Sequence, residues 1–145
     1  MTLNVYSVVN KQLAVEQYLK ANRVQIAVIT ETHQQEGERD TINIKGYKLV
    51  SSRSRQKEEK KGGVAIFLYL QISCMDTEHR VAQEESELEY CSATVFPNHN
   101  NKDQLVIVGV YRPPYKKHPP YDQAIFQMLK ANKEKKQNND NPRRF

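Results

Sequence analysis

Three short apolar runs limit the folds open to this chain of 145 residues more than any other feature. They cover Val24–Ile29, Gly62–Ile72 and Gln104–Tyr111. Runs rich in β-branched and other apolar residues are typical of strands that are covered on both faces. The last run ends before Pro113 and Pro114, since proline cannot donate to a sheet ladder. The sequence therefore predicts buried strands in a layered protein.

Weaker patterns predict further strands, with loops between them. The strands are expected over Thr2–Val9, Ile42–Val50 and Leu88–Phe96, with an interruption at Gly46 and with loops over Arg53–Lys61 and Pro97–Asp103.

Two helices are expected beside these strands. The first should span Lys11–Ala21, with Asn10 as its cap and with Val15, Tyr18 and Leu19 as its apolar stripe. The second is expected over Tyr121–Lys135. One helix after the first strand, then mostly strands, indicates a sheet-rich α/β fold of the α+β layered kind.

The composition is that of an ordinary globular protein, with 38% hydrophobic and 27% charged residues. No apolar run approaches the roughly 18 residues that a membrane helix needs, and the start does not resemble a secretory signal. We therefore expect an intracellular protein, nuclear or cytoplasmic, without a membrane partner. Cys74 and Cys91 are expected to be unpaired thiols.

The excess positive charge lies at the end of the chain. Residues 116–145 hold eight Lys or Arg and three Asp or Glu, which accounts for the whole net charge of +5. Such a tail can attract nucleic acid without specificity, although a merely solvated end is the more common case. We expect one partial domain over residues 1–136 and a disordered polar tail over residues 137–145.

A glutamate follows the first buried run, in the segment Thr30-Glu31-Thr32. Strand alternation would direct the two threonines to one side and Glu31 to the other. A carboxylate at the carboxyl end of a strand can bind a hard cation such as Mg²⁺. Taken alone, the segment fits a helix cap or a solvated side chain more readily.

Other residues could complete a site with Glu31. Asn4 could offer an amide to a cation or a phosphate, or it could simply sit in a turn. Tyr111 and Arg112 could both hold a phosphate oxygen, or they could be an aromatic edge plug and a surface cation. The Gly62–Gly63 pair allows close backbone approach, or it is only a loop exit.

Five segments in order resemble the endonuclease domain of non-LTR retrotransposons, which belongs to the endonuclease/exonuclease/phosphatase superfamily together with apurinic-site nucleases. They are LNVYSVVNK, VITET, GYKLVSSRSR, GGVAIFLY and VYRPP, between Thr2 and Pro114. The resemblance implies a four-layer αββα sandwich. It also implies hydrolysis of DNA phosphodiesters with Mg²⁺ or Mn²⁺.

The resemblance further implies a role for each matching residue. Glu31 matches the metal-binding glutamate, and Asn4 matches an asparagine that helps to hold metal and phosphate. Tyr111 matches the tyrosine that supports the scissile phosphate. Arg112 and the Gly62–Gly63 pair match positions typical of the retrotransposon branch.

Two later motifs of that family are absent from this sequence. The Gly-Asp-x-Asn strand end has no counterpart, since Asp140 lies in NNDNP without a preceding strand. The Ser-Asp-His motif is also missing, because none of the four histidines follows an aspartate. We therefore expect a truncated sandwich: a retrotransposon-type endonuclease fragment that is inactive alone.

Two other functions remain open at this stage. One is a non-catalytic remnant that binds nucleic acid through its basic tail, and the other is a phosphatase or lipid phosphodiesterase of the same superfamily. Truncation would also leave Val64, Ile66 and Leu68, or their opposite-face neighbours, without a cover.

Overall fold

The computed structural model describes residues 1–35, 41–54, 62–74, 89–97 and 104–112, together with 123, 125–127, 129 and 130. Its elements in chain order are β1 (Thr2–Asn4), η1 (Val9–Lys11), α1 (Gln12–Ala21), β2 (Ile26–Thr30), β3 (Tyr47–Arg53), β4 (Val64–Tyr69), β5 (Ser73–Cys74), β6 (Glu89–Phe96) and β7 (Leu105–Tyr111). The described residues from 123 to 130 are helical.

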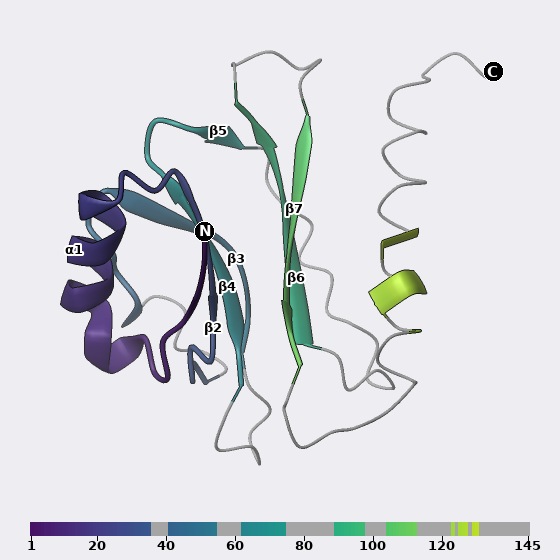
Figure 1. The fold of residues 1–145 in the computed structure, drawn as a ribbon, viewed down its shortest axis with the longest axis horizontal. Coiled ribbons are helices and arrows are strands. Elements are labelled where there is room, and N and C mark those ends of the chain that lie inside the picture. Colours follow the sequence, from purple (N-terminus) through teal and green to yellow (C-terminus); the bar gives the residue numbers. More distant parts are fainter. Residues whose placement is uncertain are drawn as a thin grey trace.

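The elements form layers in the order helix, sheet, sheet, helix. Figure 1 shows α1 on one side of the first sheet, and the described helical residues beyond β6 and β7 on the side away from α1. This arrangement confirms the expected partial αββα sandwich. No helix among the described residues is long and apolar enough to cross a membrane.

The first sheet has the strand order β1-β2-β4-β3. Strand β1 runs parallel to β2, and β4 runs antiparallel to both β2 and β3. In this register Asn4 and Val64 both lie opposite Thr30, from either side. The carboxyl ends of β1 and β2 and the start of β4 therefore meet at one edge of the sheet.

The second sheet is antiparallel, with the order β5-β6-β7. Its register places Glu89 opposite Tyr111 and Cys91 opposite Gly109. Each of these four side-chain positions belongs to the face that packs against the first sheet, because paired residues share a face. Tyr111, which ends β7, is therefore directed toward the first sheet.

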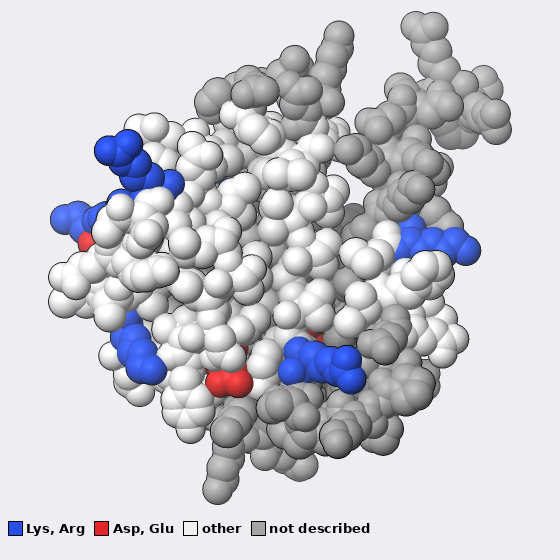
Figure 2. Space-filling model, viewed as in Figure 1, with Lys and Arg blue, Asp and Glu red and all other residues white. Residues whose placement is uncertain are grey.

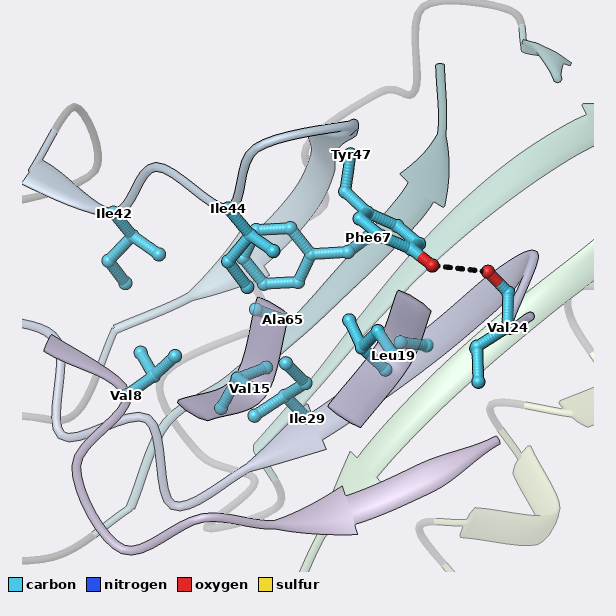
Figure 3. Packing of buried hydrophobic residues seen from close by; sticks show 11 residues of the cluster. Val8, Val15, Leu19, Val24, Ile29, Ile42, Ile44, Tyr47, Ala65 and Phe67 are labelled. Atoms are coloured by element: carbon cyan, nitrogen blue, oxygen red, sulfur yellow. Dashed lines mark hydrogen bonds between the residues drawn. The ribbon is translucent and has the colours of Figure 1, made fainter. Parts of the chain in front are cut away.

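One hydrophobic cluster lies between α1 and the first sheet. Leu19 of α1 and Ile29 of β2 are fully buried in it. Figure 3 shows the Tyr47 hydroxyl donating to the Val24 carbonyl at 2.6 Å, which ties the start of β3 to the segment before β2. The cluster comprises Val8, Val15, Leu19, Val24, Ala27, Ile29, Ile42, Ile44, Tyr47, Ala65 and Phe67.

A second cluster fills the space between the sheets. Val64, Ile66 and Leu68 of β4 are fully buried there, against Cys91, Ala93, Val95 and Tyr111. The expectation that β4 lacks a cover is therefore wrong, because the described strands of the second sheet are long enough to cover it. Exposed apolar side chains occur elsewhere among the described residues, for example Leu13 of α1, Leu70 after β4 and Phe126 of the last helical segment.

Both cysteines are free thiols, as expected. Burial of Cys91 in the second cluster raises the pKa of its thiol to about 12. This thiol therefore stays protonated and behaves as a small apolar side chain.

The structure confirms strands in all three apolar runs and changes several boundaries. Only β4 is buried on both faces, whereas β2 alternates between buried and half-buried residues and β7 is mostly half-buried. Strand β1 ends at Asn4 rather than near Val9, because Tyr6 and Ser7 adopt left-handed backbone angles. Ile42 and Ile44 are buried but precede β3, which begins after a turn at Gly46. The strand β5 was not predicted, and it has only two residues.

The first helix also differs from its prediction in detail. It begins at Gln12, and the Asn10 amide donates to the Ser7 hydroxyl instead of capping the helix. Val15 and Leu19 face the core, whereas Tyr18 is exposed. The predicted segments 55–61 and 98–103, the end of the last helix after residue 130 and the tail 137–145 lie outside the described residues.

Gly109 sets the distance between the two sheets. A methyl group there would lie 2.9 Å from Val28 Cγ1 and 3.0 Å from Val64 Cγ2. Both distances are below ordinary van der Waals contact. The absence of a side chain therefore lets β7 approach β2 and β4 closely, two residues before Tyr111.

Replacing this glycine tests the close approach. Gly109→Ala is expected to lower the free energy of unfolding by about 1–3 kcal/mol, because the added methyl overpacks the interface between the sheets. Urea unfolding measures the change. Ser92→Ala, on the opposite face of β6, serves as control and should shift stability by less than about 0.5 kcal/mol. Equal stability of Gly109→Ala and wild type would contradict this packing.

Candidate functional site

The candidate site lies where β1 and β2 end beside the end of β7. The parallel register puts Asn4 next to Thr30, one residue before Glu31. The backbone continues this pairing, because Val5 N donates to Thr30 O and Ser7 N donates to Glu31 O at 2.8 Å. The sheet edge therefore fixes the backbone around Glu31 from one side.

Glu31 itself departs from strand geometry. Its φ is +54°, in the left-handed region, and β2 has ended at Thr30. Such a conformation is uncommon outside glycine and asparagine, and it persists only where the surroundings hold it. Thr30 and Thr32 are buried, while the Glu31 side chain is 13% exposed. The left-handed turn, rather than strand alternation, sets the direction of this carboxylate.

Tyr111 reaches across from the second sheet to Glu31. Its hydroxyl donates to Glu31 Oε1 at 3.1 Å. His33 Nε2 lies 4.0 Å from the other oxygen, Oε2. The structure thus brings together two of the predicted site residues, which are 80 positions apart in the chain, and adds a histidine beside them.

The Gly62–Gly63 pair holds the Glu31 segment from the other side. His33 N donates to Gly62 O at 3.0 Å, and Thr32 N donates to Gly63 O at 3.4 Å. Both glycines have positive φ, +118° and +90°. A side chain at Gly63 would also collide with Thr32 Oγ1. The pair is therefore required by backbone conformation and by close approach, and it is more than a loop exit.

Glu89 is a buried carboxylate that no sequence motif indicated. Its Oε2 accepts from Gly63 N at 2.6 Å, and a side chain at Gly62 would meet both of its oxygens. It lies opposite Tyr111 in the second sheet. The alternation of side chains along a strand could have indicated it, because Glu89 shares the inward face of β6 with Cys91, Ala93 and Val95.

These contacts form a clasp between the two sheets. Glu89 holds Gly63, and the glycine pair holds the amides on the carboxyl side of Glu31. Tyr111, from the same sheet as Glu89, holds the carboxylate of Glu31 itself. The position of Glu31 therefore depends on both sheets being correctly docked.

Gln34 is a second buried polar group near this segment. Its side chain is fully buried, and neither Nε2 nor Oε1 has a hydrogen-bond partner among the described residues. Unpaired buried amides are costly. The sequence offered no signal for this residue, because its burial follows from the irregular segment after β2.

The remaining predicted residues lie at the same edge of the sheet. Asn4 is exposed at the end of β1, and Arg112 is exposed immediately after Tyr111. Within the part of the chain that the structure describes, no three His, Cys, Asp or Glu side chains gather as a metal site.

Charge is dispersed over the visible surface. Figure 2 shows the described Lys and Arg side chains in separate patches on that face, with acidic atoms near the lower edge. No continuous basic stripe connects these patches among the residues drawn in colour. The face shown therefore gives a binding partner only local electrostatic contacts.

Comparison with known proteins gives matches at the level of structure. No family model matches the sequence, and no curated protein matches it. The AP endonuclease from Archaeoglobus fulgidus is 23% identical with a TM-score of 0.57, covering 89% of this chain and 47% of that one. The AP endonuclease LMAP from Leishmania major is 16% identical with a TM-score of 0.56, covering 76% and 38%.

This chain has the fold of part of an AP endonuclease. It spans less than half the length of those two proteins, at 38% and 47%. The fold implied by the motif resemblance is thereby confirmed. The endonuclease domain of TRAS1, a telomere-specific non-LTR retrotransposon, is also similar, with 15% identity, a TM-score of 0.49 and coverage of 87% of this chain and 51% of that one.

The clasp can be tested through Glu89. Glu89→Ala should lower the free energy of unfolding by about 1–3 kcal/mol, because it leaves the buried Gly63 N–H without its acceptor. Amide hydrogen exchange at Thr32 and His33 should also accelerate more than elsewhere, because their acceptors belong to the glycine pair that Glu89 holds.

A matched control separates this local effect from general destabilisation. Val95→Ala removes buried volume at the other end of the same strand and should speed exchange without preference for residues 32 and 33. If Glu89→Ala changes exchange evenly across the first sheet, the proposed dependence of the Glu31 segment on Glu89 is wrong.

Proposed function

We propose that this chain forms the cation-binding edge of a Mg²⁺- or Mn²⁺-dependent DNA endonuclease and that it does not cut DNA by itself. The observation that supports this most is the hydrogen bond between Tyr111 and Glu31 across the two sheets. It places a phenol beside a carboxylate at the carboxyl ends of β1, β2 and β7, where layered α/β proteins place their sites.

The groups at this edge suit a hard cation. Glu31 Oε1 accepts from Tyr111, which leaves Oε2 and the neighbouring Asn4 amide as oxygen donors. Mg²⁺ takes one or two carboxylates and keeps several waters, so this small set is sufficient. When bound, the cation would polarise a phosphoryl oxygen and acidify a water.

Tyr111 and Arg112 would then act on the phosphate. In this structure the Tyr111 hydroxyl donates to Glu31. Its position at the edge would let it donate instead to a phosphate oxygen held at the same place. The exposed Arg112 guanidinium, which follows it, would add charge-assisted donors.

The same proposal explains why cutting is not expected. Phosphodiester hydrolysis needs an oriented water and a group to protonate or stabilise the leaving oxygen, in addition to the cation. The sequence has no histidine after an aspartate and no Gly-Asp-x-Asn segment. Binding and hydrolysis should therefore separate in this chain.

Cation binding is the direct test of the site. Mn²⁺ titration by calorimetry should detect binding that Glu31→Gln weakens by at least about tenfold, because a ligand charge is lost. Glu16→Gln is the matched control, since Glu16 is a carboxylate on α1 paired with Lys20 at 2.6 Å. Equal loss in both variants, or no binding by wild type, would contradict the proposal.

The predicted lack of cutting needs its own measurement. Supercoiled plasmid and abasic duplex should remain intact with this chain and Mg²⁺, under conditions in which a complete AP endonuclease nicks both. Robust nicking that Glu31→Gln abolishes would show that other residues of the chain replace the two missing motifs.

A further inference from the structure

A row of side chains leads outward from Glu31 along the edge of the first sheet. His33 Nε2 lies 4.0 Å from Glu31 Oε2. The Tyr6 ring contacts the His33 ring edge to face, with 4.6 Å between the ring centroids. Lys11 Nζ lies over the Tyr6 ring, 5.8 Å from its centroid. Successive contacts thus connect a cation and an exposed aromatic ring to the candidate site.

The backbone holds Tyr6 in this position at a cost. Tyr6 and Ser7 have φ of +46° and +75°, which is unusual for residues with side chains. The hydrogen bond from Ser7 N to Glu31 O and the one from Lys11 Nζ to Val5 O, at 2.7 Å, secure this conformation. Outliers of this kind cluster at ligand sites, where the conformation is part of the function.

Burial in the two described hydrophobic clusters does not account for this strained placement. Tyr6 is 54% exposed and lies outside both hydrophobic clusters, whereas His33 beneath it is mostly buried. An aromatic ring gains most from burial, so a core residue would be buried further. A ring that is half in solvent beside a cation is suited to contact with a flat ligand.

We propose that Tyr6 is a stacking platform for an unstacked nucleobase, beside a phosphate held at Glu31, with Lys11 contacting a neighbouring phosphate. The inference rests on the proposed function in so far as it places a nucleic acid strand at Glu31. Aromatic stacking tolerates any base, and lysine reads only phosphate charge. The preferred ligand is therefore single-stranded or locally unpaired nucleic acid without sequence preference.

Binding to oligonucleotides without divalent cations tests this directly. Fluorescence anisotropy with a labelled single-stranded thymidine oligomer in chelator should show that Tyr6→Ala weakens affinity about 5- to 150-fold, the range for loss of one stacked base. Tyr6→Phe keeps the ring and should bind like wild type. Tyr18→Ala is the matched control, because Tyr18 is 49% exposed on α1, and it should change affinity less than about twofold.

Two further variants keep the test decisive. Tyr6→Leu retains an apolar side chain against His33 but has no π face, so it should bind as weakly as a folded Tyr6→Ala. It replaces the alanine variant in the test if that variant folds poorly. Lys11→Gln should reduce the slope of log affinity against log salt by about one unit, as for the loss of one phosphate contact. A fully paired duplex of the same length should bind more weakly than the single strand.

The inference is overturned if Tyr6→Ala binds the single strand like wild type, or if Tyr18→Ala loses as much. Failure of Tyr6→Phe to bind would overturn it too, by assigning the effect to the hydroxyl. Absence of oligonucleotide binding by wild type has the same consequence. The Mn²⁺ titration at Glu31 is independent of all these results, so failure of this inference and failure of the proposed function are distinguishable.

Discussion

The hydrogen bond from Tyr111 to Glu31 is the contact on which the candidate site depends. It forms only if the second sheet docks on the first at the right distance. Gly109 provides that distance, because its missing side chain lets β7 lie against Val28 and Val64. Tyr111 lies two residues beyond this contact and Glu31 lies three beyond Val28. The close packing of β7 on the first sheet therefore also determines whether the Tyr111 hydroxyl reaches Glu31.

Around this bond the chain adopts conformations that are unfavourable in isolation. Tyr6, Ser7, Glu31 and His33 all have left-handed backbone angles, and all lie at the same edge. Each costs on the order of 1–3 kcal/mol. Backbone hydrogen bonds to the segment after β1 and to the glycine pair offset that cost. A region so held presents fixed side chains, which is what a site for a cation or a phosphate requires.

The sequence predicted the strands that are apolar throughout and failed where burial is irregular. The runs that became β2, β4 and β7 were identified because they are apolar almost throughout, although only β4 is buried over nearly its whole length. Ile42 and Ile44 alternate like a strand but pack under α1 as loop residues, so alternation alone misplaced them. Tyr18 fitted the helical stripe, yet it is half exposed, because spacing along a helix does not show how far the covering sheet extends.

The residues of the candidate site also divide into those that the sequence indicated and those that it did not. Motif resemblance indicated Glu31, Tyr111 and the glycine pair, because each of them lies in one of the five segments that resemble the family in order along the chain. Glu89 could have been predicted to face inward, because it occupies the same set of alternate positions in β6 as the buried apolar residues. Tyr6 and His33 could not, because their contact depends on left-handed turns that no periodic pattern encodes.

A crystal structure with Mn²⁺ tests the central claim most directly, since manganese gives an anomalous signal that locates it. The account predicts a peak bonded to a carboxylate oxygen of Glu31, beside the Asn4 amide, with the Tyr111 hydroxyl still at this edge. A well-ordered structure with manganese bound only elsewhere, or with Glu31 and Tyr111 far apart, would contradict it.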